Sequence, residues 1–178
     1  MLTGAPTADT GKMFDELNGL PAHPLLVHAA VVFVPLFAIL AIAFVVLPFL
    51  RSRLNWIVVT LAIVAPGAAF FAKESGKKLR DKKFPAELTD AVKAHQDHGE
   101  KLLWAVCGLA LVALFFVALD AASRRVKAQA AEGAAEAPAA RGRLVIMIVF
   151  GVLVLVGAGL SLWYAYKTGD TGSRMVWG

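Results

Sequence analysis

The sequence predicts an all-α membrane protein, a polytopic antiparallel bundle of four transmembrane helices. Of its 178 residues, 58% are hydrophobic and only 17% are charged, and the mean hydropathy is +0.67. A bilayer core about 30 Å thick needs roughly 20 apolar residues in a helix, and four stretches reach this length. No segment alternates apolar and polar residues as a membrane β-barrel requires. The predicted spans cover residues 24–50, 54–72, 99–121 and 144–166.

The first 19 residues are polar and rich in Gly and Thr, so we expect a flexible tail before a single membrane domain over residues 20–178. The first span opens with HPLLVH (23–28). Pro24 suits the first position of a helix, because its missing N–H has no helical partner there. His28 then lies inside the apolar segment. An imidazole in that environment needs a partner and is a candidate functional residue.

The second span follows the first after a very short turn that contains Arg51 and Arg53. We therefore expect the first two helices to be antiparallel neighbours. Small residues in the second span allow a neighbouring backbone to come close. The basic segment 77–83 that follows is expected to be a loop facing lipid head groups.

The third helix is predicted to begin at Phe84-Pro85, because proline favours the first helical turn. An apolar stripe with helical spacing includes His95 and His98 and continues into the third span, so both histidines are expected on the inward face. The helix is expected to enter the membrane near Leu102.

The third and fourth spans are separated by residues 128–140, which are mostly Ala, Glu, Gly and Pro and are expected to form a linker. Gly157 and Ser161 form a small-xxx-small pair in the fourth span. The tail after Lys167 is expected to return to the membrane interface. The sequence indicates no internal repeat, because one pair of spans has a tight turn and the other a long linker.

Four spans place both termini and the segment 73–101 on the same side of the membrane. All four histidines are therefore expected in one leaflet or at its surface, near the end of the second span and near Asp170. These histidines are His23, His28, His95 and His98.

Imidazole ligates both metals and haem iron, and a helical bundle can present such ligands from facing helices. The sharpest hypothesis is a b-type haem held between His28 and either His98 or His95. The related alternative is a divalent transition metal bound by His28, His95 and His98, with Asp170 as an oxygen ligand. The residues expected to support this site are His23, Ser75 and Gly76.

Other interpretations stay open. The histidines could instead hold helices together in a structural membrane subunit without a cofactor, or relay protons beside Asp97 and Glu100 in a small proton-coupled transporter. A transporter needs polar residues through the full depth of the membrane, and the span halves remote from the histidines have few. No Walker, dinucleotide-binding or nucleophile-elbow motif occurs, so an enzyme is not the expected class.

The remaining composition limits the partners. Cys107 is the only cysteine, which excludes an intrachain disulfide and a Cys-based metal cage. Basic residues lie between the spans, so the net charge of +5 favours lipid head groups over nucleic acid. A redox protein or a second copy is the expected protein partner. Arg51, Arg53 and five basic residues in 124–143 lie on one side, against a larger but acid-balanced basic set in 73–101 on the other. The flanks of the first span, with only Lys12 before it and Arg51 and Arg53 directly after it, favour termini outside a bacterial inner membrane.

Four motifs carry a family resemblance: HPLLVH (23–28), ESG (74–76), HQDHG (95–99) and the segment 169–178. Together they resemble a family of bacterial four-helix integral membrane proteins, a domain of unknown function. The resemblance covers nearly the whole chain from Leu20 and implies the four-helix architecture. It also implies that Asp170 stands where relatives often have histidine, which favours a hard-metal or hydrogen-bonding role. The family is similar to small membrane cytochromes, which favours haem among the cofactors.

Overall fold

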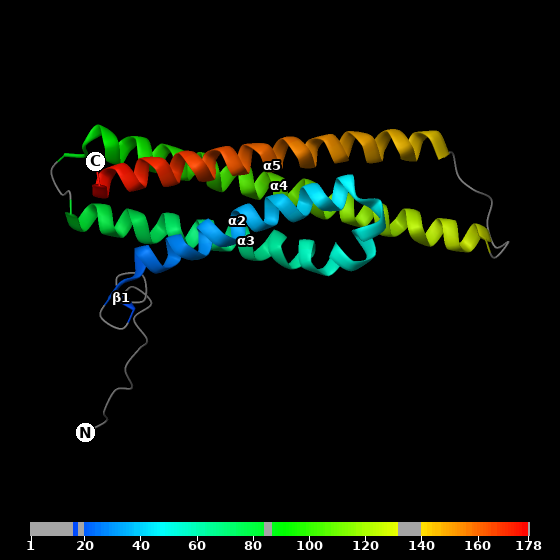
Figure 1. Cartoon of the computed structure of the whole chain (residues 1–178), viewed down its shortest axis with the longest axis horizontal. Coiled ribbons are helices and arrows are strands. Elements are labelled where there is room, and N and C mark those ends of the chain that lie inside the picture. The colour runs from blue at the N-terminus through cyan, green and yellow to red at the C-terminus, as the bar shows by residue number, and fades with distance from the viewer. Residues whose placement is uncertain (1–15, 18–19, 84–86, 132–139, 178) are drawn as a thin grey trace, which may run out of the picture.

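The computed structural model describes residues 16–17, 20–83, 87–131 and 140–177. Strand β1 (Glu16–Leu17) pairs antiparallel with strand β2 (Leu20–Pro21). Four helices follow: α2 (Ala22–Val46), α3 (Arg51–Lys83), α4 (Asp90–Ala131) and α5 (Ala140–Trp177). All four are long and apolar enough to cross a membrane. The predicted all-α bundle of four membrane helices is confirmed (Figure 1).

The helices form two antiparallel hairpins, α2 with α3 and α4 with α5 (Figure 1). Between the hairpins, α2 packs against α5 and α3 packs against α4, so α2 and α4 lie diagonally across the bundle. The starts of α2 and α4 lie at the same end as the ends of α3 and α5. We call this the histidine end, after His23, His28, His95 and His98, and the opposite end the arginine end, after Arg51 and Arg124.

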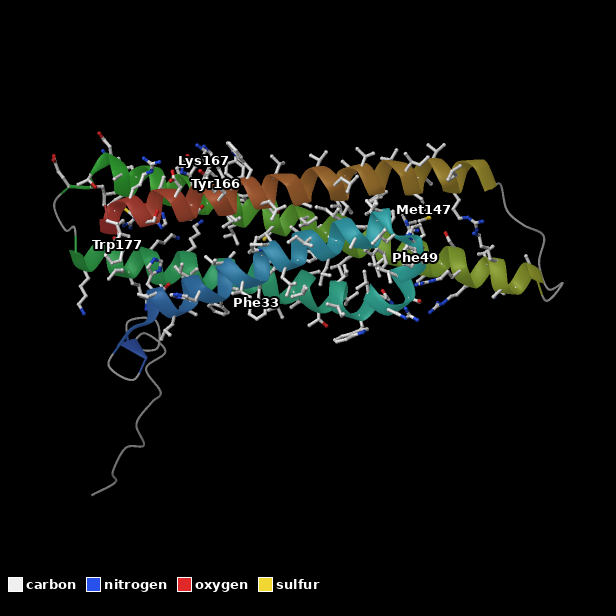
Figure 2. All side chains as sticks on the ribbon, in the orientation of Figure 1. Phe33, Phe49, Met147, Tyr166, Lys167 and Trp177 are labelled. Atoms are coloured by element: carbon white, nitrogen blue, oxygen red, sulfur yellow. The ribbon has the colours of Figure 1, made fainter. Side chains whose placement is uncertain are left out.

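The middle of the bundle is apolar and closely packed. Every helix contributes fully buried side chains, and the small residues of α3 and α5 leave room for larger ones on α2 and α4. The most buried of these are Val34, Phe37, Ala38, Ala65, Val106, Leu109, Val154 and Ala158. Large apolar side chains also cover the outer surface, as contact with lipid requires; Phe49, labelled in Figure 2, is 73% exposed.

The two hairpins bury equivalent positions. Each buried residue of α2 has a buried counterpart 72 positions later on α4: Val34 and Val106, Phe37 and Leu109, Ala38 and Ala110, Ala41 and Ala113, Phe44 and Phe116. Between α3 and α5 the offset is 96 positions: Val58 and Val154, Ala62 and Ala158, Ala65 and Ser161. The hairpins are therefore two copies of one packing pattern.

Equivalent positions lie on diagonal helices of the bundle, the relation expected of two parallel repeats in a membrane protein. The equivalent residues Phe44 and Phe116 pack edge to face, with ring centroids 5.9 Å apart. The expectation of no internal repeat was wrong. The longer second connection gives the two helix pairs different offsets, so no single shift aligns one whole hairpin with the other, although six of the eight buried pairs above are identical residues.

Three helices are longer than their predicted spans. Residues 77–83, predicted to be a loop, continue α3, and residues 167–177, predicted to return to the interface, continue α5. The extensions contact one another; for example, Arg80 Nη1 donates a hydrogen bond of 2.8 Å to Gln96 Oε1 on α4. Packing between helices thus maintains helical structure beyond the apolar spans.

Other boundaries also differ. The predicted start of the third helix lies at residues 84–86, outside the described residues. Within them, α4 begins at Asp90, where Thr89 Oγ1 accepts a hydrogen bond from the backbone N–H of Val92 as a helix cap. Residues 128–131 of the predicted linker are helical, and 132–139 lie outside the described part. The first helix ends at Val46 rather than at residue 50, because Pro48 disfavours helical backbone before it.

Arg51 joins three helices at the arginine end. Its Nε and Nη2 donate hydrogen bonds of 2.9 Å to the carbonyls of Phe44 and Val45, in the last turn of α2, where carbonyls have no helical donor. Its Nη1 forms an ion pair of 3.0 Å with Asp120 Oδ1 on α4. The guanidinium also lies 5.0 Å from the ring centroid of Phe116. Arg51 thus supplies hydrogen-bond donors to the last carbonyls of α2 and connects α2 to α4 of the other hairpin.

Replacing Arg51 with leucine should destabilise the protein by about 2 kcal/mol, because the last carbonyls of α2 lose their donors and Asp120 keeps only its ion pair of 3.1 Å with Arg124. Thermal unfolding of the purified protein in detergent measures the effect. Arg53→Leu is the matched control, because Arg53 is exposed. Equal midpoints for the two variants would contradict this role of Arg51.

Candidate functional site

His23 binds the end of α3. Its Nδ1 lies 3.2 Å from the Ala72 carbonyl oxygen and 3.0 Å from Ser75 Oγ. A carbonyl can only accept, and the Ser75 hydroxyl already donates to the Ala72 carbonyl at 2.9 Å. The proton therefore sits on Nδ1 of His23, which donates to both oxygens.

A glycine permits this contact. A Cβ placed on Gly76 would lie 3.0 Å from Cε1 of His23, closer than carbon atoms pack. The imidazole therefore lies directly against the backbone of α3.

His95 repeats the arrangement on the other hairpin. Its Nδ1 lies 3.0 Å from the Thr168 carbonyl oxygen and 3.2 Å from Thr171 Oγ1. The Thr171 hydroxyl donates within its own helix, to the Lys167 carbonyl at 2.9 Å. A Cβ on Gly172 would lie 3.1 Å from Cε1 of His95. Each contact atom has its counterpart in the first hairpin.

We call these two arrangements the histidine clasps: His23 with Ala72, Ser75 and Gly76, and His95 with Thr168, Thr171 and Gly172. Their receiving segments, 72–76 and 168–172, share the pattern of Ala or Thr, any residue, an acid, a hydroxyl residue and Gly. The acids pair locally, Glu74 with Lys77 at 2.9 Å and Asp170 with Arg174 at 3.0 Å. Aligning the ends of the second and fourth spans would have revealed this pattern in the sequence.

The other two histidines are placed differently. His28 is exposed, and its Nδ1 bonds to the Pro24 carbonyl of its own helix. No hydrogen bond in the described structure joins His28 to His95 or His98. His98 has a buried Nδ1 without a hydrogen-bond partner among the described residues. His95 lies within electrostatic range of both His23 and His98.

The predicted ligand set of three histidines with Asp170 is not gathered into one cluster. Within the described ranges, no group of three or more His, Cys, Asp or Glu side chains could hold a metal ion. Ser75 and Gly76, predicted as supporting residues, contact His23. His23 and His95 thus occupy equivalent clasps on the two hairpins, and a haem or metal ligated by His28 stays a prediction.

The buried interior offers few polar groups between the two ends. The buried polar residues of the described chain are Ser75, Asp120, Ser123 and Ser161. Ser161, in the middle of its span, donates to the Gly157 carbonyl of its own helix at 2.8 Å. The polar chemistry is therefore concentrated at the ends of the bundle.

A family model described as "Predicted membrane protein (DUF2231)" matches residues 19–178. The chain belongs to the DUF2231 family. The predicted resemblance to a family of membrane proteins of unknown function is thereby confirmed, and the match spans both hairpins. No curated protein and no solved structure matches the chain.

The clasps predict how alanine substitutions of glycine behave in this DUF2231 protein. Ala favours a helix over Gly by about 1 kcal/mol, and Gly67→Ala should raise the thermal midpoint because no atom lies within 4 Å of the new Cβ. Gly76→Ala and Gly172→Ala should show no such gain and should shift the NMR signals of His23 and His95, respectively. Stabilisation of all three variants to the same degree would contradict the clasps.

Proposed function

We propose that this membrane protein binds a redox-active group at the histidine end and serves as an electron-transfer or accessory subunit. A b-type haem is the best candidate, with His23 and His95 as the ligands. The observation that carries the proposal is the repeated clasp, which fixes two imidazoles in the same way on two diagonal helices.

The clasps leave the ligating atom of each ring available. Because Nδ1 donates to a carbonyl, Nε2 carries the lone pair that binds a metal. Histidine ligands in metal and haem sites are commonly oriented by this kind of Nδ1–H hydrogen bond. Among the described residues, neither Nε2 of His23 nor Nε2 of His95 has a hydrogen-bond partner.

The number of ligands favours haem over a bare metal ion. A porphyrin supplies four nitrogens, so a b-type haem needs only two imidazoles from the protein. A bare transition-metal ion usually takes three or four protein ligands, and the described part of the chain gathers no such set. His98, next to His95 on α4, is the third imidazole that a metal ion would recruit, with Asp170 as the oxygen ligand.

Charge favours an orientation for the site. The basic residues at the histidine end are more numerous but are interspersed with acids; Lys73, Arg80 and Lys101, for example, lie near Glu74, Asp81 and Glu100. The arginine end carries exposed basic residues directly after the first span and after the third: Arg53, Arg124, Arg125 and Lys127. Under the positive-inside rule this end faces the cytoplasm of a bacterial inner membrane. The histidine end and both termini then face outward, where a redox protein or a second copy of the chain would meet the site.

The test is an absorption spectrum of the detergent-purified protein, oxidised and reduced, with elemental analysis for iron, copper and zinc. The protein should be expressed with a haem precursor supplied. We expect a Soret band and sharp α and β bands on reduction. Both should be lost in His23→Ala and in His95→Ala, because each removes one axial ligand.

His28→Ala is the matched control and should keep the spectrum, because His28 is exposed outside the clasps. A colourless protein that binds a stoichiometric metal through His95 and His98 would replace haem by a metal site. A colourless and metal-free wild type would overturn the proposed function and favour a structural role.

A further inference from the structure

The outer face of the hairpin formed by α4 and α5 carries basic and aromatic side chains toward the histidine end. On α5, the ammonium group of Lys167 lies 5.2 Å from the ring centroid of Trp163 (Figure 2). On α4, Lys101 lies within electrostatic range of the Tyr164 hydroxyl. One turn after Lys101, Trp104 is 71% exposed. We call these residues the α4–α5 belt: Lys101, Trp104, Trp163, Tyr164 and Lys167.

Tyr164 connects the two halves of the belt. Lys167 follows Tyr164 by three residues, so the two side chains are neighbours on the same side of α5. Lys101 approaches the same tyrosine from α4. Two ammonium groups, one from each helix, are therefore gathered around one hydroxyl group. Charged donors beside a neutral donor suit a ligand with negative oxygen atoms.

The belt lies at the depth of the lipid head groups. The third span is predicted to enter the membrane near Leu102, directly after Lys101, and the fourth span is predicted to end at Tyr166, directly before Lys167. Tryptophan and tyrosine favour this interfacial layer. The phosphate groups of phospholipids lie in the same layer, so they are the negative oxygens that the belt meets.

The first hairpin shows that this depth does not by itself require charge. With the offsets of 72 and 96 positions, the equivalents of the belt residues are Ala29, Val32, Gly67, Ala68 and Phe71. None of them is charged, although the two hairpins bury equivalent positions. An ammonium group at the edge of the apolar layer is costly without a partner. The lysines of the second hairpin therefore indicate a partner that the first hairpin does not bind.

The charge of the belt favours an anionic partner. Lys101 forms an ion pair of 2.6 Å with Asp97 on its own helix, whereas no acidic side chain of the described residues pairs with Lys167. Two ammonium groups and one carboxylate leave one positive charge, which one phosphodiester group balances. A zwitterionic lipid brings an ammonium group of its own and is attracted less. The charge thus favours an anionic phospholipid.

The surface between the belt and the arginine end suits acyl chains. Gly108 lies two turns after Lys101 on the same side of α4, and no atom lies within 4 Å of a Cβ placed on it. Two turns further, Phe115 is 60% exposed, and its ring centroid lies 5.8 Å from that of Phe150 on α5. A chain attached to a phosphate at the belt therefore meets an open, apolar surface.

We propose that the α4–α5 belt binds one anionic phospholipid. Lys101 and Lys167 form ion pairs with its phosphate, and the Tyr164 hydroxyl donates a hydrogen bond to a phosphate oxygen. The acyl chains follow the apolar surface past Gly108 to Phe115. The bound lipid contacts both helices of the second hairpin, and the site is independent of any redox group at the clasps.

The experiment is native mass spectrometry of the full chain, delipidated in a non-ionic detergent and titrated with phosphatidylglycerol. We expect one lipid to bind more tightly than the rest, and phosphatidylcholine with the same acyl chains to bind more weakly at that site. Lys167→Gln should weaken phosphatidylglycerol binding about fivefold, which corresponds to about 1 kcal/mol for one lysine near anionic lipid. Lys167→Gln with Lys101→Gln should weaken it about twenty-five-fold.

Lys93→Gln is the matched control, because it removes the same charge from an exposed position of α4 outside the belt and should keep the affinity. Circular dichroism confirms that each variant folds. If the double variant fails to fold, Lys167→Gln decides, since Lys167 forms no ion pair with a described side chain. Equal affinities for the two lipids, or equal affinities of Lys167→Gln and Lys93→Gln for phosphatidylglycerol, would rule out the site.

Discussion

The structure depends on how an imidazole is accommodated where two membrane helices meet. An unpaired polar group is costly in an apolar environment, so His23 and His95 each need an acceptor from the neighbouring helix. A carbonyl and a hydroxyl one turn apart supply it, and a glycine lets the ring approach the backbone. This requirement explains why α3 and α5 carry similar segments at 72–76 and 168–172. It also fixes how the two helices of each hairpin are rotated relative to each other, because the ring can reach both oxygens at only one relative position of the helices.

Equivalent packing of the two hairpins gives the bundle its shape. The shared features are the apolar stripes and the clasps, which set the packing within each hairpin. The hairpins differ where they meet: polar contacts join α3 to α4, whereas no hydrogen bond or ion pair joins the described side chains of α2 to those of α5. At the arginine end, Arg51 supplies hydrogen-bond donors to the last carbonyls of α2.

The sequence predicted the architecture well, because apolar length determines where helices cross a bilayer. It also placed all four histidines at one end. It listed His23, Ser75 and Gly76 as supporting residues of a site ligated by His28, but it did not predict that His23 binds Ser75 directly. Rotation about the helix axis brings His23 to α3, whereas His28 is exposed. That rotation depends on packing between distant segments, which spacing within one helix does not reveal. The basic run 77–83 resembles a loop in composition, and only contact with α4 maintains it as helix.

The most direct test of the paired clasps is ¹⁵N NMR of histidine-labelled protein in bilayers at neutral pH, with His23→Gln and His95→Gln to assign the signals. The Ala72 and Thr168 carbonyls accept only. Each neutral ring should therefore carry its proton on a hydrogen-bonded Nδ1 and leave Nε2 bare or metal-bound. Matching signals from the two residues would support a duplicated site. A proton on Nε2 of either ring, or a freely rotating ring, would contradict it.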